Sequence, residues 1–455
     1  MTRLLSSLLI LATIAFSACG PKAKEANKEV KTTVEKPLKW SRDAVIYEVN
    51  IRQYTKEGTI KAFSSHLPRL KELGVDILWL MPVYPVSEKN RKGSLGSYYA
   101  VADYRAVNPE FGTMEDLKKL VTQAHQLGMK VILDWVANHT GWDNVIMAEH
   151  KDWYTQNEKG EIVVPEGTDW TDTADLNYKN EDMRNYMIGS LKFWIENANV
   201  DGFRCDVAGM VPTDFWEKAR VELDKVKPVF MLAEGWEPEL VENAFDMGYA
   251  WDGHHLMNHV AKGEKNVADI KAYFAKVDTM YHKDAYLMNF TTNHDENSWN
   301  GTTAERMGDA AKTFAVFSYT IPGMPLIYSG QEAGLNHRLK FFEKDEINWS
   351  DLTMQKFYEK LNELKKSNKA LQAGERGGKI QWLGTNKEET VCAFQRKVDG
   401  NTVVAVFNMS KAPVEVDIKG MVAGDYTDFF KNEKIQLKDN ATLKLDKWGY
   451  KIFVK

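Results

Sequence analysis

Apolar runs of strand length alternate with helical stretches over most of this 455-residue chain. Short apolar runs bounded by turn residues are typical of buried strands. They occupy residues 44–50, 75–81, 130–135, 202–207, 229–234, 285–290 and 325–329. Repeated strand–helix units predict a parallel sheet, and about eight units in this length favour a closed (β/α)8 TIM barrel of the α/β class over an open sheet. No glycine-rich phosphate loop follows the first run, which also disfavours a nucleotide-binding fold.

The stretches between these runs repeat apolar side chains at helical spacing. Residues 62–73 do so and end at Gly74. Thr113 and Asp116 open the next helix in the manner of a capping box, and Gly128 closes it. Residues 183–195 and 215–223 predict two further helices.

Two segments break the alternation. Residues 140–176 are polar, rich in Trp, Asp and Gly, and lack a helical period, which predicts a small domain inserted into the barrel of residues 40–371. After Leu371 the period becomes that of short strands at residues 379–382, 390–395, 402–408 and 414–418. Residues 372–455 are therefore predicted to form a C-terminal antiparallel β domain.

The N-terminus has the features of a targeting segment. Arg3 precedes an apolar stretch, residues 4–16, that is too short to span a bilayer comfortably. Ser17 and Ala18 then precede Cys19, which predicts a lipoprotein signal peptide over residues 1–18, with cleavage before Cys19 and a lipid on its sulfur. The alternative is an ordinary secretory signal. Residues 19–39, rich in Lys and Glu, are predicted to be a flexible tether.

Composition excludes some classes of function. The chain is 44% hydrophobic and 27% charged, which is globular, and its net charge of -5 without a basic stripe argues against a nucleic-acid partner. Besides Cys19 there are two cysteines, Cys205 and Cys392. They lie far apart in different predicted domains, so neither a disulfide between them nor a cysteine metal site is expected.

Three apolar runs each lead to a carboxylate, namely Asp206, Glu234 and Asp295. The carboxyl ends of barrel strands meet at one face, so these acids can converge on one pocket, as acid/base chemistry on a sugar requires. Arg204 lies two residues before Asp206 and points the same way, where a guanidinium would hold the carboxylate ionised. A purely structural Arg–Asp pair is the alternative.

Neighbouring residues fit such a pocket. Trp236 follows Glu234 closely, and an aromatic wall can keep a carboxyl group protonated, as a general acid must be. His139 and His294 stand at predicted strand ends, where neutral imidazoles could bond sugar hydroxyls. A single histidine there would more often be structural, but two histidines with three acids favour a site.

Several ordered motifs together carry a family resemblance. They are residues 97–104 with 108–113, 134–139, 202–206, Glu234, 293–295 and 323–332. In this order, over residues 40–371, the chain resembles glycoside hydrolase family 13, the α-amylase family.

The resemblance implies a retaining hydrolase that cleaves α-glucosidic bonds, mainly α-1,4, in malto-oligosaccharides or starch-derived glucans. Asp206 would be the nucleophile, Glu234 the acid/base and Asp295 the residue that stabilises the transition state. The remaining implied roles are orientation of Asp206 by Arg204 and sugar binding by Tyr99, His139 and His294.

Two features qualify the resemblance. Gly209 and Met210 stand where many α-amylases carry Lys and His, which leaves endo-acting starch specificity open. Asn138 and Asp175 match positions that bind calcium in some members but also occur in members without it. The chemistry is expected to need no cofactor, and a structural calcium stays open.

Two other functions compete with hydrolysis. A transglycosylase would use the same covalent intermediate with a sugar acceptor. A non-catalytic glucan-binding lipoprotein would be expected to have lost an acid, and this chain has all three. A lipid on Cys19 implies the outer membrane of a Gram-negative bacterium, facing periplasm or medium. The lack of an acidic cluster after Cys19 favours the periplasm and thus oligosaccharide substrates.

Overall fold

The computed structural model describes residues 38–455. The predicted signal peptide, Cys19 and the tether up to residue 37 lie outside the described residues. The described chain opens with buried Leu38 and a 3-10 turn, Lys39–Ser41. In the described part of the chain, no helix is both long and apolar enough to cross a membrane.

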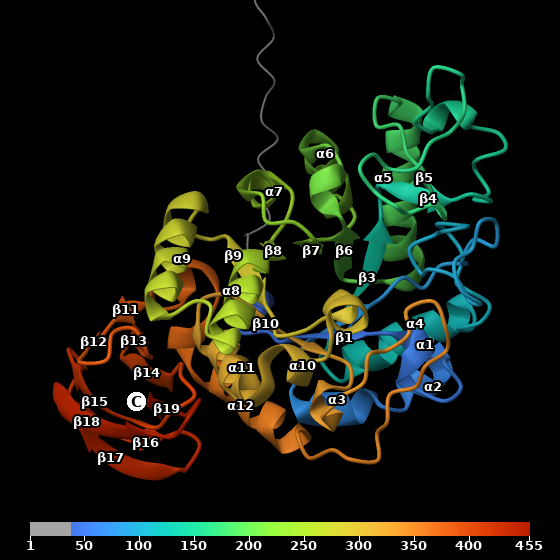
Figure 1. Ribbon diagram of the computed structural model, residues 1–455. Coiled ribbons are helices and arrows are strands. Elements are labelled where there is room, and N and C mark those ends of the chain that lie inside the picture. Colours follow the sequence, from blue (N-terminus) through green and yellow to red (C-terminus); the bar gives the residue numbers. More distant parts are fainter. Residues whose placement is uncertain (1–37) are drawn as a thin grey trace, which may run out of the picture. The chain divides into compact units, whose positions relative to one another are not determined.

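Eight parallel strands close into a barrel in the order β1-β10-β9-β8-β7-β6-β3-β2, which confirms the predicted fold class (Figure 1). The strands are β1 (Ile46–Val49), β2 (Ile77–Leu80), β3 (Lys130–Val136), β6 (Gly202–Asp206), β7 (Phe230–Ala233), β8 (Met247–Tyr249), β9 (Tyr286–Asn289) and β10 (Met324–Tyr328). Seven of them fall in the predicted runs. The eighth strand, β8, has three residues and lies outside the predicted runs.

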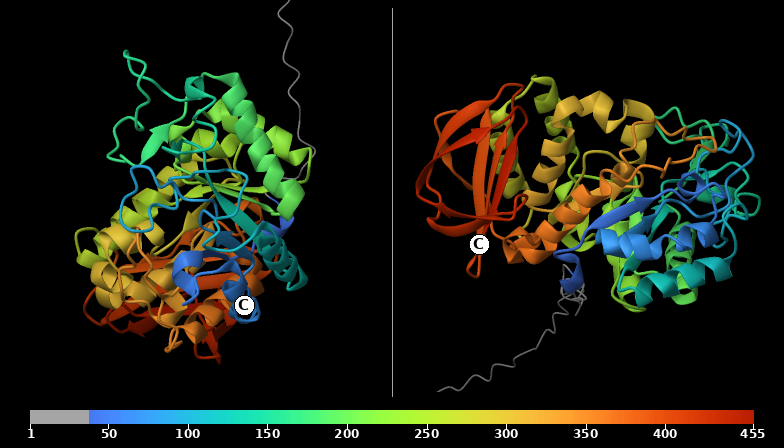
Figure 2. Two further views of the ribbon diagram at one scale, coloured as in Figure 1. Left: turned by 90° about the vertical axis from the view of Figure 1, so that its right-hand side faces the viewer. Right: turned by 90° about the horizontal axis from the view of Figure 1, so that it is seen from below.

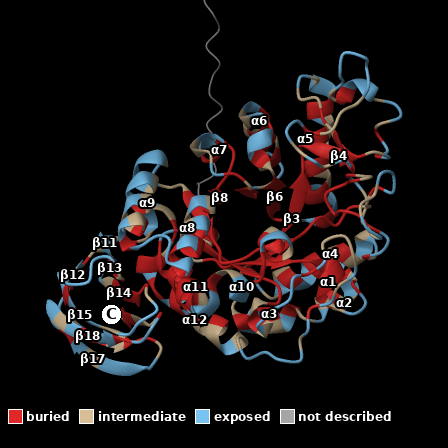
Figure 3. Ribbon diagram, in the orientation of Figure 1, coloured by how far each residue is buried: buried red, intermediate tan, exposed pale blue. Residues whose placement is uncertain are grey.

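Side chains of the barrel strands alternate between its interior and the surrounding helices. Ile132 and Trp79 belong to the interior cluster, whereas Leu133 and Leu80 belong to the cluster beneath the helices. Cys205 joins the helix-side cluster, as expected from its position between inward-facing residues. Figure 3 shows the strands buried throughout while the helices are exposed on their outer faces.

The 3-10 turn closes the barrel at the end where its strands begin. The ring of Trp40 lies 5.6 Å from that of Phe230, the first residue of β7. Ser41 Oγ lies 2.6 Å from the hydroxyl oxygen of Tyr286, the first residue of β9. The chain therefore enters the barrel at the end opposite to the strand C-termini.

The helices cover the outside of the barrel. They are α1 (Ile51–Tyr54), α2 (Ile60–Ser64), α3 (Leu67–Leu73), α4 (Met114–Gln126), α5 (Glu181–Ala198), α6 (Thr213–Asp224), α7 (Pro238–Asn243), α8 (Trp251–Lys262), α9 (Val267–Met280), α10 (Thr303–Met307), α11 (Ala311–Thr320) and α12 (Gln355–Ser367). The capping box of Thr113 and Asp116 is confirmed at the start of α4.

The single helix predicted over residues 62–73 is wrong, because the chain forms two helices there. Pro68 lies in the first turn of α3. Its ring lacks an N–H and would clash with the carbonyl four residues earlier, which belongs to Ser64, the last residue of α2. Proline therefore ends one helix and fits the first turn of the next.

The segment between β3 and α5 carries its own small sheet. β4 (His139–Gly141) pairs antiparallel with β5 (Thr173–Asp175), with His139 opposite Asp175. A 3-10 turn, Lys151–Trp153, lies between them in the sequence. The two strands hold the ends of a long loop beside the barrel mouth.

The C-terminal region forms two antiparallel sheets (Figure 2). One contains β11 (Gln381–Trp382), β13 (Val391–Val398), β14 (Asn401–Asn408), β19 (Tyr450–Val454), β16 (Gly424–Asp428) and β17 (Glu433–Leu437), and the other contains β12 (Gly384–Thr385), β15 (Val414–Lys419) and β18 (Asn440–Leu445). Asp399 and Gly400, both at positive φ, make the two-residue turn that pairs β13 with β14. The two remaining described cysteines, Cys205 and Cys392, are buried free thiols.

Candidate active site

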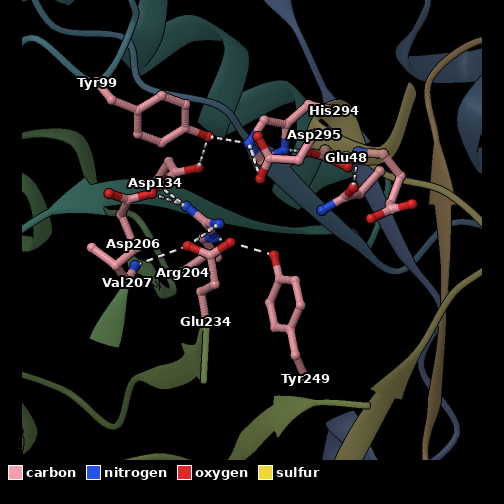
Figure 4. A network of polar contacts seen from close by, with 12 residues as sticks. Glu48, Tyr99, Asp134, Arg204, Asp206, Val207, Glu234, Tyr249, His294 and Asp295 are labelled. Atoms are coloured by element: carbon pink, nitrogen blue, oxygen red, sulfur yellow. Dashed lines mark hydrogen bonds and ion pairs between the residues drawn. The ribbon is translucent and has the colours of Figure 1, made fainter. Parts of the chain in front are cut away.

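The three acids predicted from the sequence come together at the C-terminal mouth of the barrel (Figure 4). Asp206 is the last residue of β6, Glu234 directly follows β7, and Asp295 lies in the connection after β9. All three line one cavity of about 500 Å³, together with Tyr99 and His139. That volume is typical of a small-molecule site.

Arg204 is the centre of the charge network. Its guanidinium is fully buried, and Nη1 donates hydrogen bonds of 2.9 Å both to Oδ1 of Asp206 and to Oδ1 of Asp134. Nη2 lies 2.8 Å from Oε2 of Glu234, a close ion pair whose angle falls outside hydrogen-bond geometry. Nε donates to the hydroxyl of Tyr249. One cation thus faces three carboxylates.

This arrangement decides the charge of Asp206. Burial raises the pKa of Asp206 well above its usual value, and Glu234 and Asp134 raise it further, while Arg204 lowers it. Burial likewise raises the pKa of Asp134, and Arg204 again lowers it. The anionic form of Asp206, which a nucleophile needs, therefore depends on the Arg204 guanidinium.

Val207 links Asp206 to Glu234. Its backbone N–H donates a 2.8 Å hydrogen bond to Oε2 of Glu234. Val207 has a φ of 36°, in the left-handed region that a β-branched residue rarely adopts. Strain of this kind is concentrated at functional sites. Here it turns the amide that directly follows β6 towards Glu234.

Tyr99 lies beside His294 with nearly parallel rings, 5.5 Å apart and inclined by 19°. Its hydroxyl lies 2.8 Å from Nε2 of His294 and donates to Oδ2 of Asp134 at 3.2 Å. Trp79 Nε1 donates to the same Asp134 oxygen at 3.0 Å. Asp134 therefore fixes both the Arg204 side and the Tyr99 side of the cavity floor.

His294 is held between two acids. Nδ1 lies 2.5 Å from Oε1 of Glu48, and Nε2 lies 3.3 Å from Oδ2 of Asp295. Burial lowers the pKa of His294, but Asp295 and Glu48 outweigh it and raise the pKa to about 9. The expectation of a neutral imidazole is wrong at this position, because neighbouring carboxylates stabilise the imidazolium. Burial also raises the pKa of Asp295, and His294 opposes that shift.

His139 behaves in the opposite way. It is buried, and burial lowers its pKa to about 3, so its imidazole is neutral as predicted. Its ring lies 5.3 Å from that of Trp170 in the inserted segment. A neutral ring can donate one hydrogen bond and accept another, which suits a sugar hydroxyl.

The family model described as "Alpha amylase, catalytic domain" matches residues 27–389. The chain belongs to the α-amylase family. A second model, "Maltogenic Amylase, C-terminal domain", matches residues 383–452, which include most of the two antiparallel sheets.

Named members of the α-amylase family resemble the chain at modest identity. The α-amylase MalA of Haloarcula japonica is 28% identical over 413 residues, which cover 87% of this chain and 59% of that protein. A cyclomaltodextrinase of a Bacillus species is 26% identical, covering 83% of this chain and 75% of the relative. The chain thus spans about three fifths of the length of the first relative and three quarters of the second.

Solved structures of family members superpose on the whole described fold. The noncanonic maltogenic α-amylase AmyB from Thermotoga neapolitana is 28% identical with a TM-score of 0.82, covering 91% of this chain and 98% of that one. An α-amylase from Lactobacillus plantarum is 31% identical, also with a TM-score of 0.82, covering 91% and 99%.

Several residues of this α-amylase family site were missed in the sequence. Glu48 was not singled out, and Asp134 was named only as the first residue of a motif, without a role of its own. Both are charged residues inside mostly apolar strands, and that signal could have identified them as part of the site. The cavity walls lie on loops without a period, except for one residue in the short π-helical turn Glu296–Asn300, so no pattern indicated them. These wall residues are Lys92, Asp169, Trp170, Asp172, Trp299, Phe341 and Phe342.

Asn138 and Asp175 are the positions that match calcium ligands of some family members. The Nδ2 atom of Asn138 lies 3.3 Å from Nδ1 of His139, and Asp175 is half-buried in β5. Calcium needs six to eight oxygens. Within residues 38–455 no group of three or more His, Cys, Asp or Glu side chains is placed to hold a metal ion. A structural calcium therefore stays open.

Proposed function

We propose that the protein is a retaining glycoside hydrolase that cleaves α-glucosidic bonds, mainly α-1,4, in malto-oligosaccharides or starch-derived glucans. The observation that carries the proposal is the convergence of Asp206, Glu234 and Asp295 at the barrel mouth around one buried guanidinium. Relatives named α-amylase, maltogenic α-amylase and cyclomaltodextrinase support the substrate class.

The first chemical step is the exchange of a glycosidic bond for an ester. A carboxylate oxygen of Asp206 attacks the anomeric carbon, and the bond to the leaving oxygen breaks as Glu234 transfers its proton to that oxygen. Arg204 favours the anionic form of Asp206 against the opposing effect of burial. The Val207 N–H and the Arg204 guanidinium hold the Glu234 carboxyl group in place.

The second step returns the enzyme to its starting state. Glu234, now a carboxylate, removes a proton from water, and the hydroxide oxygen attacks the anomeric carbon while the bond to Asp206 breaks. Two inversions leave the α configuration unchanged.

The other predicted residues bind the sugar whose bond is cleaved. Tyr99 supplies a flat aromatic face, and His139 supplies a neutral ring for a hydroxyl. Asp295 keeps 34% of its side chain exposed, so it can reach sugar hydroxyls, while the His294 imidazolium lies within 3.3 Å of it. Positive charge beside Asp295 favours its carboxylate form.

The leaving side differs from that of many α-amylases. Met210 is 44% exposed and Trp236 is 50% exposed. Gly209 lies so close to Glu237 that a side chain at this position would meet its carboxylate at 2.9 Å. An exposed apolar surface here could hold a second sugar as acceptor, which keeps transglycosylation as an alternative outcome of the same intermediate.

Product analysis tests the proposal. Wild-type protein and Asp206→Asn are incubated with maltoheptaose, and the anomer formed first is followed by NMR. We expect α-anomeric products from the wild type and none from the variant. Hydrolysis by Asp206→Asn, or initial β products, would overturn the assignment of Asp206. Longer oligomers in the presence of excess maltose would identify a transglycosylase, and an inactive wild type that binds maltoheptaose would identify a glucan-binding protein.

The location of the protein is part of the proposal. Cys19 would carry a lipid that anchors the chain in the outer membrane of a Gram-negative bacterium, on the periplasmic side or at the surface. Fractionation of cells that express wild type or Cys19→Ala tests this. We expect the wild type with the membranes and the variant in the soluble fraction. Membrane association of both proteins would contradict the anchor.

A further inference from the structure

Three loops contact one another around the cavity. We call residues 88–97 the Lys92 loop, residues 165–173 the Trp170 loop, and residues 337–345 the Phe341 loop. Each contributes residues to the cavity lining, and the Lys92 loop lies between the other two. Its contacts on both sides determine how far the cavity opens.

Towards the Trp170 loop, Lys92 forms a bridge. Its Nζ lies 3.3 Å from Oδ1 of Asp172 and donates a hydrogen bond of 3.0 Å to the carbonyl oxygen of Asp169. Asp172 is buried, with 4% exposure, and Lys92 is about a third exposed. All three residues line the cavity. The bridge therefore crosses the edge of the cavity itself.

On its other side, the Lys92 loop is joined to the Phe341 loop by backbone and side-chain hydrogen bonds. The N–H of Ser94 donates to Oε1 of Glu343 at 2.9 Å, and its hydroxyl donates to the other oxygen of that carboxylate. The N–H of Leu95 donates to the carbonyl oxygen of Phe342 at 3.0 Å. Gly93 has a φ of 64°, and a Cβ there would lie 2.4 Å from Cβ of Phe342. Only glycine permits this approach.

A buried arginine holds the Lys92 loop from below. Nη1 of Arg52 donates to the carbonyl oxygen of Gly96 at 3.0 Å, and Nη2 donates to that of Leu95 at 3.2 Å. The loop is thus fixed on three sides. These contacts hold the Lys92 loop in one position beside the cavity.

The Lys92 loop lies on the side of the cavity that would hold the retained sugar. Ser97 ends the Lys92 loop and Tyr99 lies two residues beyond it, and both line the cavity, where Tyr99 lies against His294. The proposed function places Tyr99 under the sugar that Asp206 attacks. Glucose units further along this side lead to the non-reducing end, because the attacked sugar contributes C1 to the cleaved bond. The exposed Met210 and Trp236, which the proposed function places on the leaving side, do not line the cavity.

We propose that the Lys92 bridge to Asp169 and Asp172 makes this site chain-end specific, so that it takes the non-reducing ends of short α-glucans and rejects internal bonds. The inference rests on the proposed hydrolase function. It names Lys92 as a residue that determines specificity through the shape of the cavity.

An end-blocked substrate tests the bridge. Rates are measured on a maltoheptaoside with a free non-reducing end and on the same compound with an ethylidene group on that end. We expect the wild type to cleave the blocked compound about tenfold more slowly or worse, because the bulky end meets the wall. Lys92→Met removes the bridging charge while keeping most of the stem, and should raise the blocked-to-free rate ratio several-fold.

Two control variants isolate the bridge. Lys92→Arg keeps a cation and should preserve the wild-type ratio. Lys89→Met changes an exposed lysine of the same loop that does not line the cavity, and should leave the ratio unchanged.

The outcomes separate the two proposals. Cleavage of the free substrate by the wild type, and its loss in Asp206→Asn, report on the hydrolase function alone. With that activity present, equal wild-type rates on both substrates, or an unchanged ratio in Lys92→Met, would overturn the chain-end specificity. If the wild type cleaves neither substrate, both proposals are wrong.

Discussion

Oε1 of Glu48 lies 2.5 Å from Nδ1 of His294, so a carboxylate on the first barrel strand acts with Asp295 to raise the pKa of a histidine in the cavity. Both side chains are buried. Burial raises the pKa of Glu48, and the nearby imidazolium opposes that shift. The pair supports the sugar-binding side of the cavity from beneath.

Glu48→Gln should move the basic limb of the pH–activity profile towards lower pH. The pKa of His294 is raised from 6.5 to about 9 in the folded protein, and the variant removes one of the two carboxylates that raise it. We expect kcat/KM for maltoheptaose to fall at a pH about one unit lower than in the wild type. Glu264→Gln, which alters an exposed Glu–His pair with His259, is the matched control and should not move the profile.

The same pair predicts how stability depends on pH. A histidine whose pKa is higher in the folded state stabilises the fold below its unfolded value of 6.5, and that contribution is lost as pH rises through about 9. Melting temperatures from pH 6 to pH 10 should therefore fall more steeply for the wild type than for Glu48→Gln. Parallel curves would contradict the charged state of His294.

Asp206→Asn should abolish hydrolysis without destabilising the fold. Burial raises the pKa of Asp206, so its anionic form is unfavourable in the folded protein, and this penalty is present above the ordinary value of 3.8. A neutral amide removes it, and Arg204 retains Asp134 and Glu234 as partners. We expect activity to drop by at least about a thousandfold while the melting temperature at pH 7 stays equal or rises. A clear fall in melting temperature would show that Asp206 stabilises the fold.

Arg204→Met should destabilise the protein strongly at neutral pH. It leaves three buried carboxylates without their cation, and loss of one partner of a buried ion pair typically costs about 3–5 kcal/mol. The loss in free energy of unfolding should become smaller as pH falls, because protonation neutralises the three unpaired carboxylates. Chemical denaturation at pH 5 and pH 8 measures this. Arg338→Met, which removes an exposed partner of Glu305, should leave the free energy of unfolding nearly unchanged at both pH values.

Tyr99→Phe and Tyr99→Ala should separate two roles of this side chain. Phenylalanine keeps the ring under the sugar but removes the hydroxyl that contacts His294 and Asp134. We expect kcat/KM to fall about tenfold, which corresponds to one buried hydrogen bond left unmade. Alanine removes the ring as well and should raise KM in addition. Equal effects of the two variants would mean that the ring does not contact the substrate.

The barrel was predictable because its signals are local. Seven strands are apolar runs of four to seven residues, and the Thr113 capping box and the alternation around Cys205 acted as expected. β8 was not predicted because three residues carry no readable period. The helix break at Pro68 was a local signal that the apolar spacing of residues 62–73 concealed.

The site was predictable where it depends on strand ends. Asp206 and Glu234 meet because neighbouring parallel strands, β6 and β7, end at the same face. The charge of His294 depends on Glu48, some 246 positions away in the sequence, and no spacing rule connects them. The Lys92 bridge likewise joins two loops whose contact is set by the whole fold.

Trp40 and Ser41 determine where the chain enters the barrel, and therefore which end of the barrel an N-terminal anchor would hold. Their contacts with the first residues of β7 and β9 place the entering chain opposite the catalytic cavity. With the proposed lipid on Cys19, any force from the anchor would act on that closed end. The catalytic mouth, at the other end of the barrel, would then lie away from the point of attachment.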